Sequence, residues 1–119
     1  MKLRSVQVDA LSEPARRDFL ERMRVHLRRF FPRQCQSMND AQLNARVCNG
    51  VRRAGKYDIV NERDVCKYCD LMFALGENFD ADSRYPWAAA ILSEERLDPT
   101  VKTNRLFKEA LRRRQGNPA

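Results

Sequence analysis

The residues best suited to chemistry are two cysteines in a C-x-x-C pattern, Cys66 and Cys69. A zinc site usually takes four ligands, from two such pairs or from one pair and histidines. The other thiols, Cys35 and Cys48, have twelve residues between them, and His26 is the single histidine, so no familiar zinc spacing is matched. A thioredoxin-like role would need a βαβ context, which is missing. We therefore expect thiols that pack in the core, with no metal and no cofactor.

An acidic loop from Asn78 to Asp82 resembles the beginning of a calcium-binding loop. The EF-hand pattern requires glycine at its sixth position and glutamate at its twelfth. This chain has Ser83 and Ala89 at those positions. We therefore expect a solvated loop in which Asp82 or Ser83 helps to cap the next helix.

His26 stands in an arginine-rich segment, where acid–base catalysis would need a carboxylate or a nucleophile within reach. The nearby acids Asp18 and Glu21 lie off the right helical face or are surface ion-pair partners. We therefore expect a surface or half-buried histidine. The chain has no glycine-rich phosphate loop and no nucleophile elbow. We predict no catalytic residue and a protein that is not an enzyme.

Hydrophobic periodicity predicts that helices carry these residues. Ser12 is the expected N-cap of the first helix, and Pro32 ends it because proline disfavours helical geometry in the residue before it. Asn39 and Gln42 form a capping-box signature at the start of a second helix. Gly55 is the expected left-handed stop of that helix.

A third helix is predicted over residues 62–75, between the N-cap Asn61 and a stop at Gly76. Apolar residues cover most of its faces, which is typical of a helix at the centre of a fold. Pro86 and Pro99 stand at the first position of two further helices. We predict an all-α, compact bundle of about five helices with a buried central helix (62–75). It forms one domain over 1–119, with flexible ends at 1–11 and 116–119.

The composition is that of a globular domain, with 119 residues, 43% hydrophobic and 33% charged. No run approaches the roughly 18 apolar residues that a membrane span needs. The N-terminal residues lack the continuous apolar segment of a signal peptide. We therefore expect a cytoplasmic location, reduced thiols and no membrane partner.

The net charge of +7 is concentrated towards the two ends of the chain. Residues 1–33 and 99–119 each carry +5, whereas residues 34–98 carry −3. This distribution favours an acidic partner, either an acidic protein surface or a nucleic acid. Helices that read nucleic acids often present polar base-reading residues, whereas arginine dominates here. A protein partner is therefore the preferred prediction.

Basic residues of the first and last helices are the first candidates for contacts with a partner. Aromatic residues around the acidic loop are the second, because they either anchor an interface or close one end of the core. Of these, Phe79 is the more typical of a core plug. The candidate set comprises Arg17, Arg24, Arg28, Phe79, Tyr85, Trp87, Arg112 and Arg113.

Three stretches share an overall pattern with a known group of proteins. They are His26 to Phe31 with Pro32 and Cys35, then E-R-D-V-C-K-Y-C-D-L-M-F-A-L-G-E-N-F-D, and then Y-P-W-A-A-A-I-L. Over residues 23–97 the chain resembles small uncharacterised proteins encoded in bacterial type VI secretion clusters, beside spike, PAAR-tip and effector-adaptor genes. That group has no catalytic motif to carry over.

The resemblance implies an accessory role in effector loading, such as a co-chaperone that supports an adaptor chaperone. The expected partner is then a protein with an acidic surface, whether an adaptor chaperone, an effector or a toxin. Immunity proteins are encoded in the same clusters, so neutralisation of a cognate toxin is an alternative function. Nucleic-acid binding through the two basic helices is the other alternative.

Overall fold

The computed structural model of the chain describes residues 8–116, which contain helices and no strand. The predicted all-α class is therefore confirmed. Within these residues, no helix has the length and apolar character that crossing a bilayer requires. The elements are η1 (Val8–Ala10), α1 (Glu13–Phe30), α2 (Pro32–Cys35), α3 (Asp40–Gly55), α4 (Glu62–Leu75), η2 (Phe79–Ala81), α5 (Pro86–Leu92) and α6 (Pro99–Gly116).

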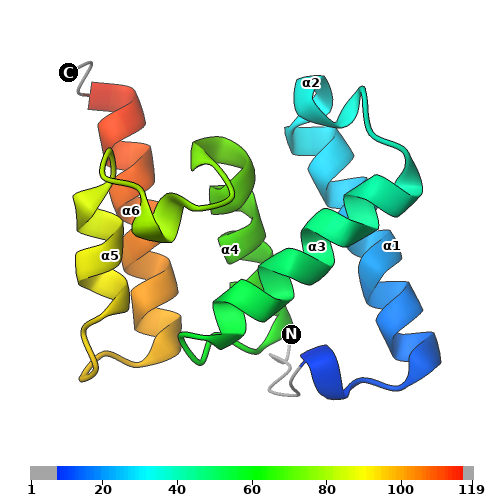
Figure 1. The fold of residues 1–119 in the computed structure, drawn as a ribbon, viewed down its shortest axis with the longest axis horizontal. Helices are drawn as coiled ribbons and strands as arrows, with labels where there is room; N and C mark the ends of the chain where they lie inside the picture. The colour runs from blue at the N-terminus through cyan, green and yellow to red at the C-terminus, as the bar shows by residue number, and fades with distance from the viewer. Residues whose placement is uncertain (1–7, 117–119) are drawn as a thin grey trace.

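Helix α4 is the central element of the fold. It packs against α3 and α6, with α1 and α2 on one side of it and α5 and α6 on the other (Figure 1). Val65, Tyr68 and Cys69 are each at most 1% exposed, and Leu71 and Met72 are also buried. The predicted buried helix over 62–75 is confirmed with the same boundaries.

The helices begin where the sequence predicted. Ser12 accepts a hydrogen bond from the Ala15 amide at the start of α1. At the start of α3, the Asn39 side chain accepts from the Gln42 amide, and the Gln42 side chain accepts from the Asn39 amide. Asn61 caps α4 in the same way through the amide of Asp64. Each cap satisfies amides that have no partner within the helix.

The end of α3 differs from the prediction. Gly55 does not adopt a left-handed conformation and belongs to the helix itself. The chain reverses three residues later, at Asp58, whose φ is 62°. Aspartate is one of the few residues other than glycine that tolerate this region. The later turn carries Ile59 into the core, where it is fully buried and its amide donates to the Ala54 carbonyl.

Pro32 ends α1 as predicted and also opens the four-residue helix α2, which the sequence did not predict. Proline is well suited to the first helical position because it needs no amide partner there. This extra turn places Cys35 in the core with 4% of its surface exposed.

The first described residues pack onto the bundle. Val8 is 3% exposed, and its amide donates to the carbonyl of Val60. Val8 and Leu11 therefore pack on the core, although the sequence predicted a flexible end over 1–11. Gly116, which was also predicted to be flexible, is the last residue of α6. The other predicted flexible positions, 1–7 and 117–119, lie outside the described residues.

A buried polar cluster joins the end of α3 to η2. The Asp80 side chain, only 3% exposed, accepts hydrogen bonds from Arg53 at 2.9 Å and from the Tyr57 hydroxyl at 2.5 Å. Burial opposes ionisation of Asp80, but the hydrogen bonds from Tyr57 and Arg53 outweigh it and hold the pKa of Asp80 below its ordinary value. Burial of Tyr57 and its hydrogen bond to Asp80 raise the pKa of Tyr57 to about 12.

The close approach of α3 to α4 gives the first prediction. A Cβ added at Gly50 would lie 2.5 Å from the Cys69 sulfur, whereas a Cβ at Gly55 would meet nothing within 4 Å. Gly50→Ala is expected to lower the free energy of unfolding by about 1–3 kcal/mol, because the buried interface is overpacked. Gly55→Ala is the matched control, and its better helix propensity should leave stability unchanged or raise it by up to about 1 kcal/mol. Urea unfolding measures both values, and equal effects would contradict the close packing.

The second prediction concerns pH. Because the folded-state pKa of Asp80 is lowered, its stabilising effect is complete above the unfolded-state pKa and is lost as the pH falls through the folded-state pKa. Asp80→Asn should lower the free energy of unfolding by about 1–3 kcal/mol at pH 7. The difference from wild type should shrink as the pH falls below about 4. Urea unfolding from pH 7 to pH 3 measures it, with the exposed Glu95→Gln as the control. A difference that is independent of pH would contradict the role of the charge.

Candidate functional site

A groove of about 820 Å³ opens between α1, α4 and α6, and we refer to it as the α1–α6 groove. Helix α1 packs on α3, while α6 packs on α4 and α5, so the facing sides of α1 and α6 are left apart (Figure 1). The residues of α4 that line the groove include Leu71 and Leu75. Its other apolar lining residues include Phe30, Trp87, Phe107 and Leu111.

Two of the apolar side chains that line the groove are largely exposed to solvent. Phe30 is 58% exposed and Leu111 is 45% exposed, one on each side of the groove. Scattered exposed apolar residues are ordinary on a protein surface, whereas apolar residues that line one groove are a candidate binding site. The sequence singled out neither Phe30 nor Leu111 as a binding residue.

The predicted residues Tyr85, Trp87 and Arg113 come together in this groove. Tyr85 and Trp87 are half-buried and contact each other edge to face, with ring centroids 6.0 Å apart. The Arg113 guanidinium lies 5.4 Å from the centroid of the Trp87 ring, at a cation–π distance. Arg113 also pairs with Glu109 at 2.7 Å, which holds it in place over the indole.

Positive charge gathers where the groove meets the end of α6. Arg113 and Arg114 both line the groove, and both are exposed. Arg112, another predicted residue, forms a 2.6 Å ion pair with Glu109 and does not line the groove. The groove therefore combines apolar walls with a basic end.

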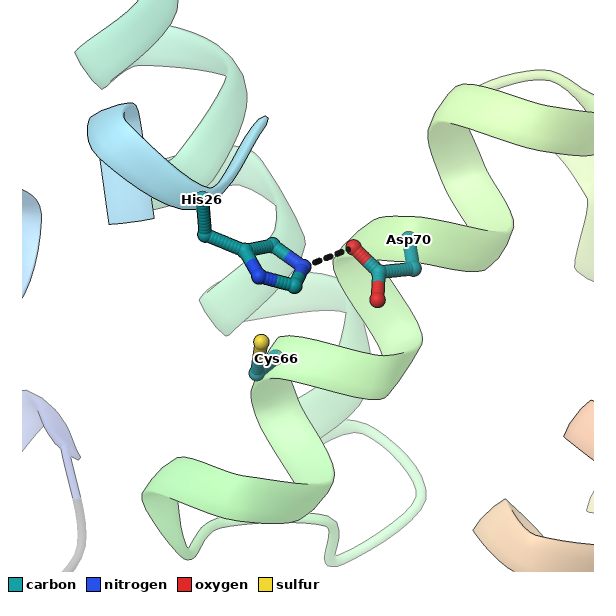
Figure 2. A group of neighbouring side chains, drawn as sticks. All are labelled: His26, Cys66 and Asp70. Carbon is teal, nitrogen blue, oxygen red and sulfur yellow. Dashed lines mark hydrogen bonds and ion pairs between the residues drawn. The ribbon is translucent and has the colours of Figure 1, made fainter. Parts of the chain in front are cut away.

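A histidine–aspartate pair lies in another part of the groove. Nε2 of His26 is 2.8 Å from Oδ1 of Asp70 (Figure 2). The imidazole ring also packs on the Phe30 ring. Burial raises the pKa of Asp70, and the neighbouring His26 opposes that rise. His26 is half-buried, as predicted, but its partner is 44 residues away and is neither Asp18 nor Glu21.

Cys66 lies next to this pair. The ligating atoms of His26, Cys66 and Asp70 all lie within 4.8 Å of one another. Burial, with a contribution from Asp70, raises the pKa of the Cys66 thiol to about 12. A nucleophilic cysteine needs a lowered pKa and access to substrate, whereas Cys66 does not line the groove. The trio is therefore poorly arranged for catalysis by a thiolate.

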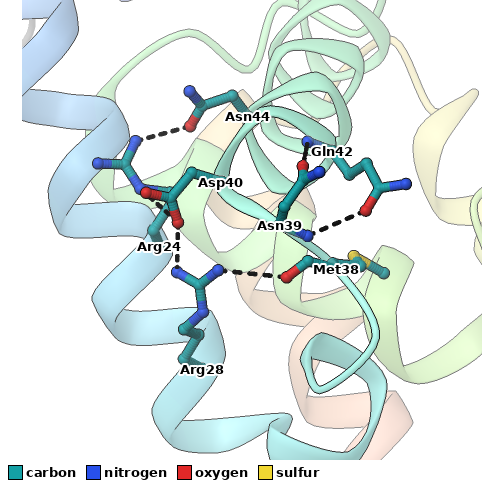
Figure 3. A network of polar contacts seen from close by, with 7 residues as sticks. All are labelled: Arg24, Arg28, Met38, Asn39, Asp40, Gln42 and Asn44. Atoms are coloured by element: carbon teal, nitrogen blue, oxygen red, sulfur yellow. Dashed lines mark hydrogen bonds and ion pairs between the residues drawn. The ribbon is translucent and has the colours of Figure 1, made fainter.

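The predicted arginines of α1 are occupied within the fold or lie away from the groove. Arg24 donates to Asn44 at 2.7 Å, and Arg28 pairs with Asp40 at 2.9 Å (Figure 3). Both join α1 to the N-terminal part of α3, a structural use that the sequence did not reveal. Arg17 is exposed and lies 3.9 Å from Glu13, outside the groove lining.

The prediction that Phe79 contacts a partner was wrong. Its side chain is fully buried, and its ring packs on Tyr68 with centroids 5.0 Å apart. The short helix η2 turns the ring inward, beside the buried Asp80. Phe79 is therefore the core plug that the sequence also suggested.

The four cysteines are free thiols in different settings. Cys35 and Cys69 are buried, as expected of thiols that pack in the core, Cys66 is half-buried and Cys48 is exposed. Sequence reasoning missed the grouping of Cys66 with Asp70 and His26. The four-residue spacing of Cys66 and Asp70 was a signal that both share one helical face, but nothing local placed His26 opposite them.

Comparison of the chain with protein families, curated proteins and solved structures gives no match.

The different burial of the four cysteines gives the third prediction. Cys48 should react first with an alkylating reagent, because it is exposed and burial raises the pKa of Cys35, Cys66 and Cys69. We expect Cys66 to react roughly 100-fold or more slowly than the exposed Cys48, since Cys66 is half-buried and burial raises its pKa to about 12. A time course read by mass spectrometry measures this, with Cys48→Ser removing the fast phase. A fast phase that remains in that variant would contradict the assignment.

Proposed function

We propose that this protein is a non-enzymatic, cytoplasmic protein-binding factor, acting as a co-chaperone or adaptor in type VI secretion effector loading. The observation that carries the proposal is the α1–α6 groove, with exposed Phe30 and Leu111 and with Arg113 and Arg114 at its basic end. The resemblance of residues 23–97 supports the secretion context.

The groove suits an amphipathic segment of a partner, either an effector or its adaptor chaperone. An amphipathic helix binds by placing a row of apolar side chains into such a groove. Burial of Phe30, Leu111 and Trp87 supplies affinity because apolar surface leaves water. Arg114, which is exposed at the groove's basic end, favours acidic residues at one end of that segment and so orients it.

Charge elsewhere on the molecule argues for a protein partner over nucleic acid. Phosphate binding needs cations that are available to the backbone of the nucleic acid. Arg24 and Arg28 already make ion pairs or hydrogen bonds with α3, and Arg22 pairs with Asp18 and Glu62. The basic composition of α1 therefore overstates the charge that it offers to a ligand.

The fourth prediction tests the groove with matched substitutions. In affinity purification from the native cells, wild type should recover an effector or an adaptor chaperone of the secretion system. Phe30→Asp and Leu111→Asp should reduce that recovery at least about tenfold, which corresponds to ~1.4 kcal/mol. Val25→Asp is the control, because Val25 is on α1 and is 64% exposed but does not line the groove. Circular dichroism checks that each variant keeps its helices.

Recovery of no secretion component, or equal recovery by all four proteins, would contradict the proposal. Rescue of cells by co-expression with the toxin of a neighbouring gene would instead indicate an immunity protein. A mobility shift of DNA or RNA that weakens with salt would indicate nucleic-acid binding.

A further inference from the structure

Three side chains from two helices bring metal-ligating atoms together beside the groove. His26 comes from α1, and Cys66 and Asp70 lie one turn apart on α4, facing the imidazole ring (Figure 2). Their nitrogen, sulfur and oxygen atoms all lie within 4.8 Å of one another. We propose that His26, Cys66 and Asp70 form a binding site for a thiophilic divalent cation, with Zn²⁺ the best match.

The distances between the three ligating atoms are close to those between neighbouring ligands of a zinc ion. Tetrahedral bonds of about 2.0–2.3 Å place neighbouring donor atoms about 3.4–3.6 Å apart. The Cys66 sulfur would therefore move closer by about 1.2 Å at most, given the 4.8 Å limit. The His26–Asp70 contact, now 2.8 Å, would open by about 0.6 Å. Rotation of the side chains can supply such shifts while both helices stay in place.

The donor set selects the class of ion. Calcium and magnesium take oxygen ligands, so a site that includes a thiol and an imidazole disfavours them. Thiolate, imidazole and carboxylate are the three ligand types that zinc takes in proteins. Binding displaces the thiol proton to solvent, as in other cysteine–zinc sites. It also displaces the proton of the His26–Asp70 hydrogen bond, so the imidazole binds through Nε2 and carries its remaining proton on Nδ1.

The site leaves one coordination position for another donor. Zinc sites with three protein ligands keep a fourth position for water or a substrate. His26 and Asp70 line the α1–α6 groove, whereas Cys66 lies outside its lining, so the open position faces the groove. Water or a donor from a bound partner would fill it. The metal site itself requires no partner and stands independently of the proposed function.

The fifth prediction is tested with the reduced, full-length protein and Co²⁺ as a spectroscopic substitute for Zn²⁺. We expect one Co²⁺ per chain, with visible bands of a tetrahedral ion and a near-ultraviolet band from thiolate-to-cobalt charge transfer. Zn²⁺ should abolish both sets of bands by competition, whereas excess Mg²⁺ or Ca²⁺ should leave them unchanged. Absence of the bands in wild type would overturn the site and leave His26–Asp70 as a structural ion pair.

Substitutions assign the ligands. Cys66→Ser should remove the charge-transfer band, and Cys66→Ser, His26→Gln and Asp70→Asn should each weaken Zn²⁺ binding. For Cys66→Ser and His26→Gln we expect a loss of at least about 100-fold, because even loss of an outer-shell partner costs 10–100-fold. Cys48→Ser is the matched control, because that exposed thiol lies elsewhere and its loss should change nothing. Bands that survive Cys66→Ser but vanish in Cys48→Ser would overturn the proposal.

One further test uses the wild-type protein, so its result does not depend on whether a variant folds. Zn²⁺ should protect Cys66 from alkylation relative to the metal-free protein, as read by mass spectrometry at that residue. Protection confined to Cys48, or no protection of Cys66, would count against the site.

Discussion

The burial of α4 is the constraint on which the rest of the fold depends. Its large side chains contact neighbours on several sides, and each buried one contributes roughly 1.5–3 kcal/mol of apolar stabilisation. One neighbour, α3, approaches so closely that a Cβ at position 50 would clash with the Cys69 sulfur. Cys69 is therefore a packing residue whose small size matters more than its reactivity.

The groove follows from this central packing. Helix α6 covers one side of α4, while α1 is attached mainly through α3. Because α1 and α6 are supported by different neighbours, their facing sides do not close over α4. The same arrangement exposes Phe30 and Leu111 and leaves Asp70 half-buried beside His26. The candidate site is thus a consequence of how the core is built, and its walls rest on well-packed helices.

Local signals in the sequence predicted most of the fold, because caps and stops act within one helical turn. Asn39, Asn61 and Gly76 sit at the predicted helix ends, as does the proline that opens α5. The features that the sequence did not predict depend on tertiary contacts. The turn after α3 uses Asp58 instead of Gly55, because Ile59 must enter the core. Likewise, the sequence left Phe79 as either a core plug or an interface residue, and its burial against Tyr68 decides for the plug.

The candidate site was harder to predict for a related reason. Charge and aromatic content selected Tyr85, Trp87 and Arg113, and all three line the groove. The same reasoning also selected Arg24 and Arg28, since composition does not reveal that Asp40 and Asn44 occupy them. His26 and Asp70 meet across 44 residues, so only the crossing of α1 and α4 reveals the pair.

The His26–Asp70 pair lines the α1–α6 groove, so the proposed metal site adjoins the proposed partner-binding surface. Apolar walls and a basic end can hold a partner by themselves, whereas a cation at His26, Cys66 and Asp70 would add a directional contact inside the same groove. Apolar burial is non-directional, but a metal bond fixes the position of one donor atom. A groove with both features would distinguish partners that share an apolar stripe but differ in one coordinating side chain.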